Sequence, residues 1–273
     1  MPTEKVALSF VSSVEAVASL IDAISNLSWG SQPALYIDLE GTKLSREGTI
    51  SIVSIYVQPL KHVYLVDVHT LREAAFTTPG ARLWSGRSLD LKAIFEAQDI
   101  TKVFFDVRND SDALYAHYGI RLRGVEDVQL MENACRPDGR RRFLNGLDRC
   151  IDQDLHVTRA EKTAWKSVKE KGLALFHPRK GGSYEVFNAR PLDPNIERYC
   201  INDVVFLPIL RAQYLTRLDG AWQIKVAHET INRVRESQEA SYQPHREDKA
   251  FGPWEQPPKS ERHPKAEEEK RIQ

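Results

Sequence analysis

The sequence is poor in the features that mark several large classes of protein. Its 273 residues include only three cysteines, Cys135, Cys150 and Cys200, and no CxxC pair. This disfavours a disulfide framework and a structural zinc site, and it suits a reducing compartment. The chain has no run of about 18 apolar residues to span a membrane, and its first residues lack the apolar core of a signal peptide. We therefore expect an intracellular protein, cytoplasmic or nuclear, with no membrane partner.

An excess of charge of either sign is also missing. The chain has 38 Lys and Arg residues against 38 Asp and Glu residues, so its formal net charge is zero. No global positive field attracts nucleic acid, and any such binding must depend on local basic patches or on bound metal ions.

The order of predicted elements indicates the fold class. Two β-rich runs at 49–59 and 62–68 are joined by a short turn and predict an antiparallel hairpin. Strands are expected at 34–40 and 101–107, with a short strand running into a helix over 125–135, and residues 72–88 are expected to form a loop. Helices are expected at 14–27, 89–98, 110–119, 144–155, 159–171 and 193–236. This order predicts an α/β fold, a mixed sheet with helices on both faces.

The last part of the chain has a different composition. Residues 241–273 contain five prolines, and their seven Lys and Arg cancel their seven Asp and Glu. We therefore expect one domain over residues 1–240 and a disordered tail over 241–273. Phe251 and Trp254 are exceptions in the tail, because they could dock as a short peptide on the domain or on a protein partner.

Acidic residues are placed unusually in three segments. Asp38 and Glu40 alternate at the end of the strand "LYIDLEG", so their carboxylates share one face. Asp110 follows the strand "KVFF" at the start of a helix. Tyr199 and Asp203 are four residues apart on a helix and share the face that is turned toward the protein.

Each of these residues has an ordinary structural explanation when it is taken alone. Acids at a strand end are often solvated, an Asp at a helix start is often an N-cap, and a tyrosine beside an apolar run is often in the core. An acid on the buried side of a helix is nevertheless costly without a partner. Asp106 and Asp112 are alternatives to Asp110. Asp106 is the stronger one, since Asp112 lies about 200° around the helix from Asp110.

Together the segments "IDLEG", "KVFFDVRNDSDALY" and "RPLDPNIERYCINDVVFL" resemble the DEDD 3′–5′ exonucleases over about residues 5–235. The YxxxD spacing of Tyr199 and Asp203 resembles the DEDDy branch, and the chain looks most similar to its ribonuclease D-like group, which includes relatives of the Egalitarian protein. The resemblance implies a ribonuclease H-like fold, in agreement with the predicted order of elements.

The resemblance also implies a catalytic set and a cofactor. The catalytic residues would be Asp38, Glu40, Asp110, Tyr199 and Asp203, and the four acids would be metal ligands. Converging carboxylates repel one another unless cations bind, and a set without Cys or His favours Mg²⁺ or Mn²⁺ over zinc.

Two ions about 4 Å apart can activate a water and stabilise the leaving oxygen in phosphoryl displacement. By resemblance, Asp38 bridges both ions, and Glu40 and Asp203 complete the site that holds the attacking water. Asp110 supports the second ion, and the Tyr199 hydroxyl orients the water. The product would be a nucleoside 5′-monophosphate cut from a 3′ end.

Substrate contacts are expected close to these motifs. The candidates are Leu39, Phe105, Asn109 and Arg142. Phe105 stands where many relatives carry a polar residue, often His, and with Phe104 it could offer a surface on which bases stack, although core packing is the competing role. Trp165 is expected in the core. Basic candidates for strand contact are Arg136, Arg140, Arg141, Arg142, Arg179 and Lys180, and a solvated basic loop is the alternative.

Two functions are consistent with this sequence. The first is an active exonuclease on single-stranded nucleic acid, with RNA as the expected substrate. The second is a catalytically inactive RNA-binding adaptor of the same fold. All four acids and the tyrosine are present, which favours the enzyme. The choice between RNA and DNA stays open, because recognition of the 2′-hydroxyl leaves no readable motif.

Overall fold

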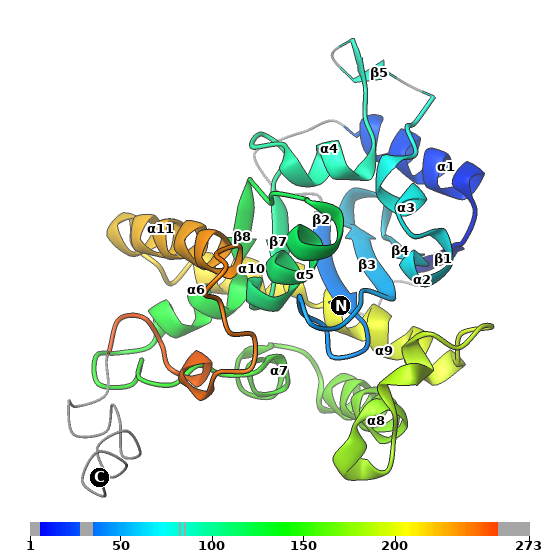
Figure 1. Cartoon of the computed structure of the whole chain (residues 1–273). Helices are drawn as coiled ribbons and strands as arrows, with labels where there is room; N and C mark the ends of the chain where they lie inside the picture. The colour runs from blue at the N-terminus through cyan, green and yellow to red at the C-terminus, as the bar shows by residue number, and fades with distance from the viewer. Residues whose placement is uncertain (1–5, 28–34, 82, 85, 256–273) are drawn as a thin grey trace, which may run out of the picture.

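A computed structural model describes residues 6–27, 35–81, 83–84 and 86–255 (Figure 1). At its centre is a six-stranded mixed sheet in the order β1-β4-β3-β2-β7-β8. The strands are β1 (Ala7–Val11), β2 (Leu35–Glu40), β3 (Ile52–Val57), β4 (His62–Val66), β7 (Lys102–Phe104) and β8 (Val125–Asp127). A separate two-stranded hairpin is formed by β5 (Leu83–Trp84) and β6 (Arg87–Ser88).

Strand directions confirm the predicted hairpin. β3 runs antiparallel to both β2 and β4, whereas β2, β7 and β8 are parallel to one another. A 3₁₀ turn over Gln58–Leu60 joins β3 to β4, with Pro59 in its first turn and Lys61 in the left-handed region at φ 49°. β1, which pairs in parallel with β4 at the sheet edge, was not among the predicted strands.

Helices cover both faces of the sheet, which confirms the predicted ribonuclease H-like layering (Figure 1). The first face carries α1 (Val14–Ser25), α2 (Val68–Leu71), α3 (Ala74–Thr77), α4 (Leu91–Glu96) and α5 (Arg108–Tyr118). The second carries α6 (Val128–Cys135), α7 (Leu147–Asp154), α8 (Arg159–Phe176), α9 (Pro194–Val205) and α10 (Leu207–Leu215). The last helix, α11 (Gly220–Ser237), packs on α5, α6 and β8. Within the described part of the chain, no helix is long and apolar enough to cross a membrane.

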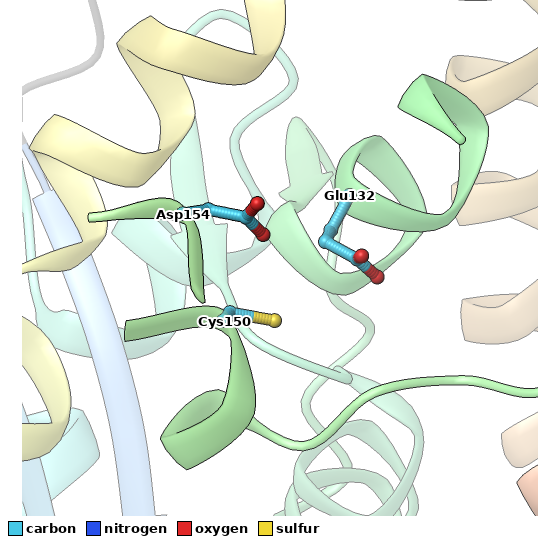
Figure 2. A group of neighbouring side chains, drawn as sticks. All are labelled: Glu132, Cys150 and Asp154. Carbon is cyan, nitrogen blue, oxygen red and sulfur yellow. The ribbon is translucent and has the colours of Figure 1, made fainter. Parts of the chain in front are cut away.

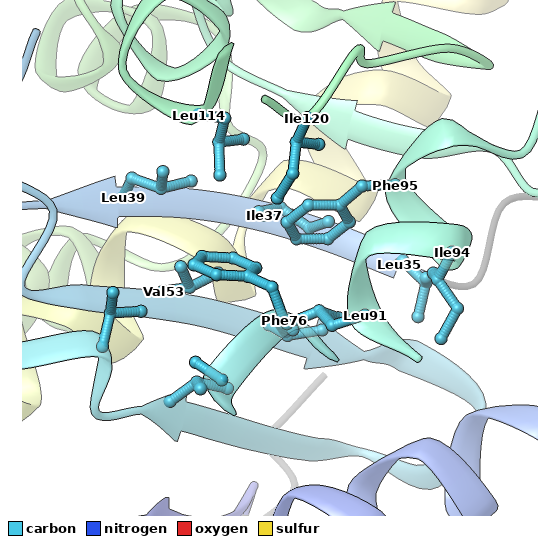
Figure 3. Packing of buried hydrophobic residues seen from close by; sticks show 14 of the residues in the cluster. Leu35, Ile37, Leu39, Val53, Phe76, Leu91, Ile94, Phe95, Leu114 and Ile120 are labelled. Atoms are coloured by element: carbon cyan, nitrogen blue, oxygen red, sulfur yellow. The ribbon is translucent and has the colours of Figure 1, made fainter. Parts of the chain in front are cut away.

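The central strand β2 divides its side chains between the two faces. Its odd-numbered residues point into the hydrophobic core under the helices of the first face, here called the first core, where they contact Phe76 of α3 and Phe95 of α4 (Figure 3). Tyr36 points into the hydrophobic core on the second face, the second core. Because side chains alternate along a strand, Asp38 and Glu40 point to the same face as Tyr36, which is the face covered by α9.

The predicted long helix over 193–236 is three helices in the structure. α9 ends at Val205, and α10 has Pro208 in its first turn. Proline lacks an N–H and its ring clashes with the preceding turn, so one helix cannot run through this position. α11 begins at Gly220 and is capped by Asp219, whose side chain accepts a hydrogen bond from the Trp222 backbone N–H. The predicted loop over 72–88 also differs, since it contains α3 and the β5–β6 hairpin.

The predicted disordered tail needs correction for residues 241–255, which pack against the domain. The Phe251 ring lies 5.1 Å from that of Phe143, and the Trp254 ring 5.3 Å from that of Trp222, between centroids. The Gly252 backbone N–H donates to the Arg142 carbonyl at 2.8 Å. Docking of Phe251 and Trp254 on the domain was the expected exception, and the structure has it. The composition of the segment predicted disorder, but docked aromatic area and paired backbone can offset the cost of ordering a short segment. Residues 256–273 of the predicted tail lie outside the described residues.

Candidate active site

Two of the predicted acids lie at the end of the central strand. Asp38 and Glu40 are the fourth and sixth residues of β2, between β3 and β7. The chain turns out of the strand at Gly41, where a Cβ would lie 1.9 Å from the Thr49 carbonyl oxygen. Only glycine allows this close approach, and it lets the chain leave the strand directly after the second acid.

α9 brings Tyr199 and Asp203 to the same place. Asp193 caps this helix by accepting from the Asn195 backbone, and Pro194 occupies its first turn. Tyr199 and Asp203 are one turn apart on the buried face, each 6% exposed. Carboxylate oxygens of Asp38, Glu40 and Asp203 all lie within 4.8 Å of one another. The acids of β2 and the acid of α9 are more than 160 positions apart in the sequence, yet they form one compact group.

Asp110 stands beside this group. It lies in the first turn of α5, which follows β7, the strand next to β2. Its carboxylate is buried, at 6% exposure. Burial raises the pKa of the Asp110 carboxyl well above its usual range, and the negative charge of Asp38 adds to the rise. Asp110 and Asp38 are therefore close enough for their charges to interact.

The alternatives to Asp110 have arginine partners. Asp112 is fully buried and accepts from Nε of Arg46 at 2.6 Å and from its backbone N–H at 2.7 Å. Asp106 accepts two hydrogen bonds from Arg108, at 2.6 and 2.7 Å. Burial opposes the charge on Asp106, but Arg108 and the neighbouring Arg233 hold its pKa at about 2. Both acids are thus already paired within the fold.

Burial and, after it, like-charge repulsion oppose ionisation of the acids in this group. Burial raises the pKa of Asp38 to about 7, with a further contribution from the charge of Asp203. Burial and the charge of Asp38 also raise the pKa of Glu40 well above its usual range. Carboxylates this close cannot all be ionised without a cation between them. Because they are hard oxygen ligands, a divalent cation fits them and would stabilise their charged forms. The donor set therefore fits Mg²⁺ or Mn²⁺.

One functional candidate was missed from the sequence. Lys169 of α8 donates to both carboxylate oxygens of Asp203, at 2.9 and 2.7 Å, and to the Tyr199 hydroxyl at 2.9 Å. Its position depends on how α8 packs on α9, which local sequence does not determine. The sequence did offer one indication of its position. Lys169 follows Trp165 by four residues and precedes Gly172 by three, and this spacing places all three on one face of a helix.

A family model described as 3′–5′ exonuclease matches residues 9–219. The chain belongs to this exonuclease family. The match agrees with the predicted DEDD type, and exonucleases of this family act with divalent metal ions. Among curated proteins, none matches the sequence.

Solved ribonuclease structures share the exonuclease fold. Trypanosoma brucei RNase D in complex with GMP is 19% identical with a TM-score of 0.64, and the alignment covers 86% of this chain and 65% of that one. The same enzyme with RNA U12 is 19% identical with a TM-score of 0.65, covering 87% and 72%. Escherichia coli RNase D is 20% identical with a TM-score of 0.55, covering 85% and 51%. The exonuclease chain thus spans between about half and three quarters of these proteins, and at such identities the likeness concerns the fold.

The predicted substrate residues of this exonuclease lie in different environments. Leu39 is 2% exposed and its side chain packs in the first core, turned away from Asp38 by alternation, so only its backbone could contact a substrate. Phe105 is half-buried and packs against the second core. The Asn109 side-chain oxygen accepts from the Tyr242 hydroxyl at 2.9 Å and from Lys249. The Arg142 guanidinium lies 5.0 Å from the Phe143 ring centroid. The C-terminal segment, residues 241–255, therefore contacts Asn109 through Tyr242 and Lys249, and it contacts Arg142 through the backbone N–H of Gly252.

The predicted basic and aromatic candidates of the exonuclease are also partly buried and partly exposed. Arg136 pairs with Glu132, and Arg141 is buried over the Trp222 ring at 4.2 Å, so both stabilise the fold. Phe104 and Trp165 are core residues. The basic candidates that are exposed are Arg140, Arg179 and Lys180.

A second group of possible ligands lies between α6 and α7 (Figure 2). It contains Glu132, Cys150 and Asp154. Glu132 is paired with Arg136, and Asp154 accepts from the Tyr214 hydroxyl at 2.9 Å. Burial raises the pKa of the Cys150 thiol, which keeps it protonated and a poor ligand. These contacts make the group a satisfied polar cluster of the core.

Proposed function

We propose that the chain is a DEDDy-type exoribonuclease that removes nucleoside 5′-monophosphates from the 3′ end of single-stranded RNA. The observation that carries the proposal is the convergence of Asp38, Glu40 and Asp203 within 4.8 Å, with Tyr199 one helical turn from Asp203. RNA is favoured because similar solved structures hold RNA U12 and GMP.

Two Mg²⁺ or Mn²⁺ ions are the proposed cofactors. Asp38, Glu40 and Asp203 would hold the first ion, and Asp38 and Asp110 the second. When bound, such ions offset the charge that develops on a transferring phosphoryl group and lower the pKa of bound water. The carboxylates fit this role because Asp38, Glu40 and Asp203 lie close together, Asp110 is buried beside them, and all four offer only oxygen donors.

Tyr199 is the proposed positioning group for the attacking water. Its ring is held edge-on by the Phe176 ring at 5.1 Å and lies against Gly172 of α8. Its hydroxyl oxygen accepts from Lys169, and the hydroxyl also hydrogen-bonds the Asp203 carboxylate, so it is held in place beside the acids. A hydroxyl fixed in this way supplies orientation, which lowers the barrier without a change in charge.

A cleavage assay on short 5′-labelled RNA and DNA tests this proposal. The full chain is incubated with Mg²⁺, Mn²⁺ or chelator, on strands that end in a 3′-hydroxyl or a 3′-phosphate. We expect RNA products that shorten by one nucleotide at a time, only with metal and only from the 3′-hydroxyl strand. Binding of RNA without cleavage under every condition would instead support the inactive adaptor.

A further inference from the structure

α8 delivers a lysine to the acidic group from outside the predicted motifs. Trp165 is buried on the α8 face that packs on α9, and Gly172 lies against Tyr199. A Cβ at Gly172 would come within 2.4 Å of Cδ2 of the Tyr199 ring. Glycine therefore lets the two helices approach closely, and this approach brings the Lys169 side chain to the acids.

The Lys169 ammonium is fully engaged. An ammonium has three N–H donors, and three oxygens lie within 2.9 Å of this one: two of Asp203 and the hydroxyl of Tyr199. The ammonium also lies 4.3 Å from the centroid of the Tyr199 ring. The Lys169 and Asp203 side chains are 17% and 6% exposed. Water therefore screens this ion pair only weakly.

These contacts conflict with metal binding. Asp203 gives both of its oxygens to Lys169, yet it is one of three acids whose oxygens are close enough to share an ion. A divalent ion that takes an Asp203 oxygen would be placed near the ammonium, and two cations at such a separation repel. The ion pair and the metal site therefore compete for one carboxylate.

We propose that Lys169 is the resident counter-ion of the site, which neutralises Asp203 in the metal-free protein and competes with the divalent ion for that carboxylate. The inference rests on the proposed function, since it assumes that a divalent ion binds these acids. Its consequence is a site that stays stable without metal and fills only at a higher free metal concentration.

Calorimetry with Mn²⁺ alone on the full chain, without nucleic acid, tests this inference. Lys169→Met removes the charge and keeps a long apolar stem beside Trp165 and Tyr199, so we expect Mn²⁺ to bind roughly 3- to 30-fold more tightly. Lys169→Arg keeps the charge and should keep the weaker binding. Lys166→Met, at an exposed position of α8, is the matched control and should behave as the wild type. In chelator, Lys169→Met should also melt at a lower temperature, because the acids lose their counter-ion.

Failure of this inference is distinguishable from failure of the proposed function. Equal or weaker Mn²⁺ binding by Lys169→Met, with measurable binding by the wild type, would overturn the role of Lys169 alone. Loss of binding in Asp203→Asn establishes that the measured site is this one. An absence of Mn²⁺ binding in the wild type and in all variants would overturn both the counter-ion and the metal site.

Discussion

At the scale of single residues, several acids of the site are destabilised in their charged forms. Asp38, Glu40 and Asp110 are acids that burial and mutual repulsion push toward the neutral form. A fold tolerates such residues where a ligand or an ion stabilises their charged form. Asp106 and Asp112, only a few residues from Asp110, show the opposite case, in which arginine partners stabilise the charge.

Tyr199→Phe tests the role of the hydroxyl. If it positions the attacking water, its loss should slow RNA hydrolysis by roughly 10- to 1,000-fold. Mn²⁺ affinity should be almost unchanged, because Tyr199 is not a proposed ligand. Calorimetry and single-turnover cleavage on the same preparations measure both quantities, and a joint loss of Mn²⁺ binding and activity would assign Tyr199 a different role.

Alanine substitutions at the three neighbouring aspartates separate the site from the scaffold. Asp110→Ala should abolish cleavage and leave the melting temperature at or above that of the wild type. Asp112→Ala should lower the melting temperature, because Arg46 would lose its carboxylate partner. Cleavage and thermal melting are measured together. An inactive Asp106→Ala variant beside an active Asp110→Ala variant would make Asp106 the acid of this segment.

At the scale of elements, the close packing of α8 on α9 supports the site. Gly172→Ala should destabilise the chain by about 1–3 kcal/mol, although alanine is the better helix former, because its Cβ would overlap the Tyr199 ring. Ala164→Ser, at an exposed position of the same helix, is the control. Denaturant unfolding measures the difference, and a Gly172→Ala variant more stable than the wild type would show that the helices are not packed this closely.

The C-terminal segment is an element that the composition did not reveal. A chain that ends at Ala240 should melt about 5 °C lower or more, because it loses the Phe251 and Trp254 contacts and the backbone bond from Gly252. A chain that ends at Glu255 is the matched control and should melt as the full chain does. Equal melting temperatures for all three would mean that residues 241–255 do not stabilise the domain.

Local patterns predicted the elements that carry the acids. Alternation in β2 and the four-residue spacing in α9 each placed two side chains on one face, and the structure has both arrangements. The same alternation turns the Leu39 side chain into the core, so the predicted substrate contact of Leu39 could involve only its backbone. Docking of Phe251 and Trp254 was an expectation from the sequence, but the position of Lys169 and the ordering of residues 241–255 as a whole were not, because they depend on surfaces that form only when distant segments pack together.

At the scale of the whole molecule, one sheet brings the acids together and two cores hold it in place. β2 and the start of α5 supply three acids at one end of the sheet, and α9 crosses the second face to supply the fourth. The neutral net charge agrees with this arrangement, since the attraction for a phosphate would come from bound ions rather than from an overall field.

Asp38→Asn tests the account most directly. The variant and the wild type are melted at pH 8 with Mn²⁺ or with chelator, and RNA cleavage is followed in the same samples. In chelator the variant should melt at or above the wild type. The folded-state pKa of Asp38, about 7, is above its unfolded value, so ionised Asp38 lowers stability at pH 8 and asparagine removes that cost. Mn²⁺ should raise the melting temperature of the wild type alone, and only the wild type should release nucleotides. Near-normal cleavage by Asp38→Asn, or equal stabilisation of both proteins by Mn²⁺, would contradict a metal-dependent exonuclease site at Asp38.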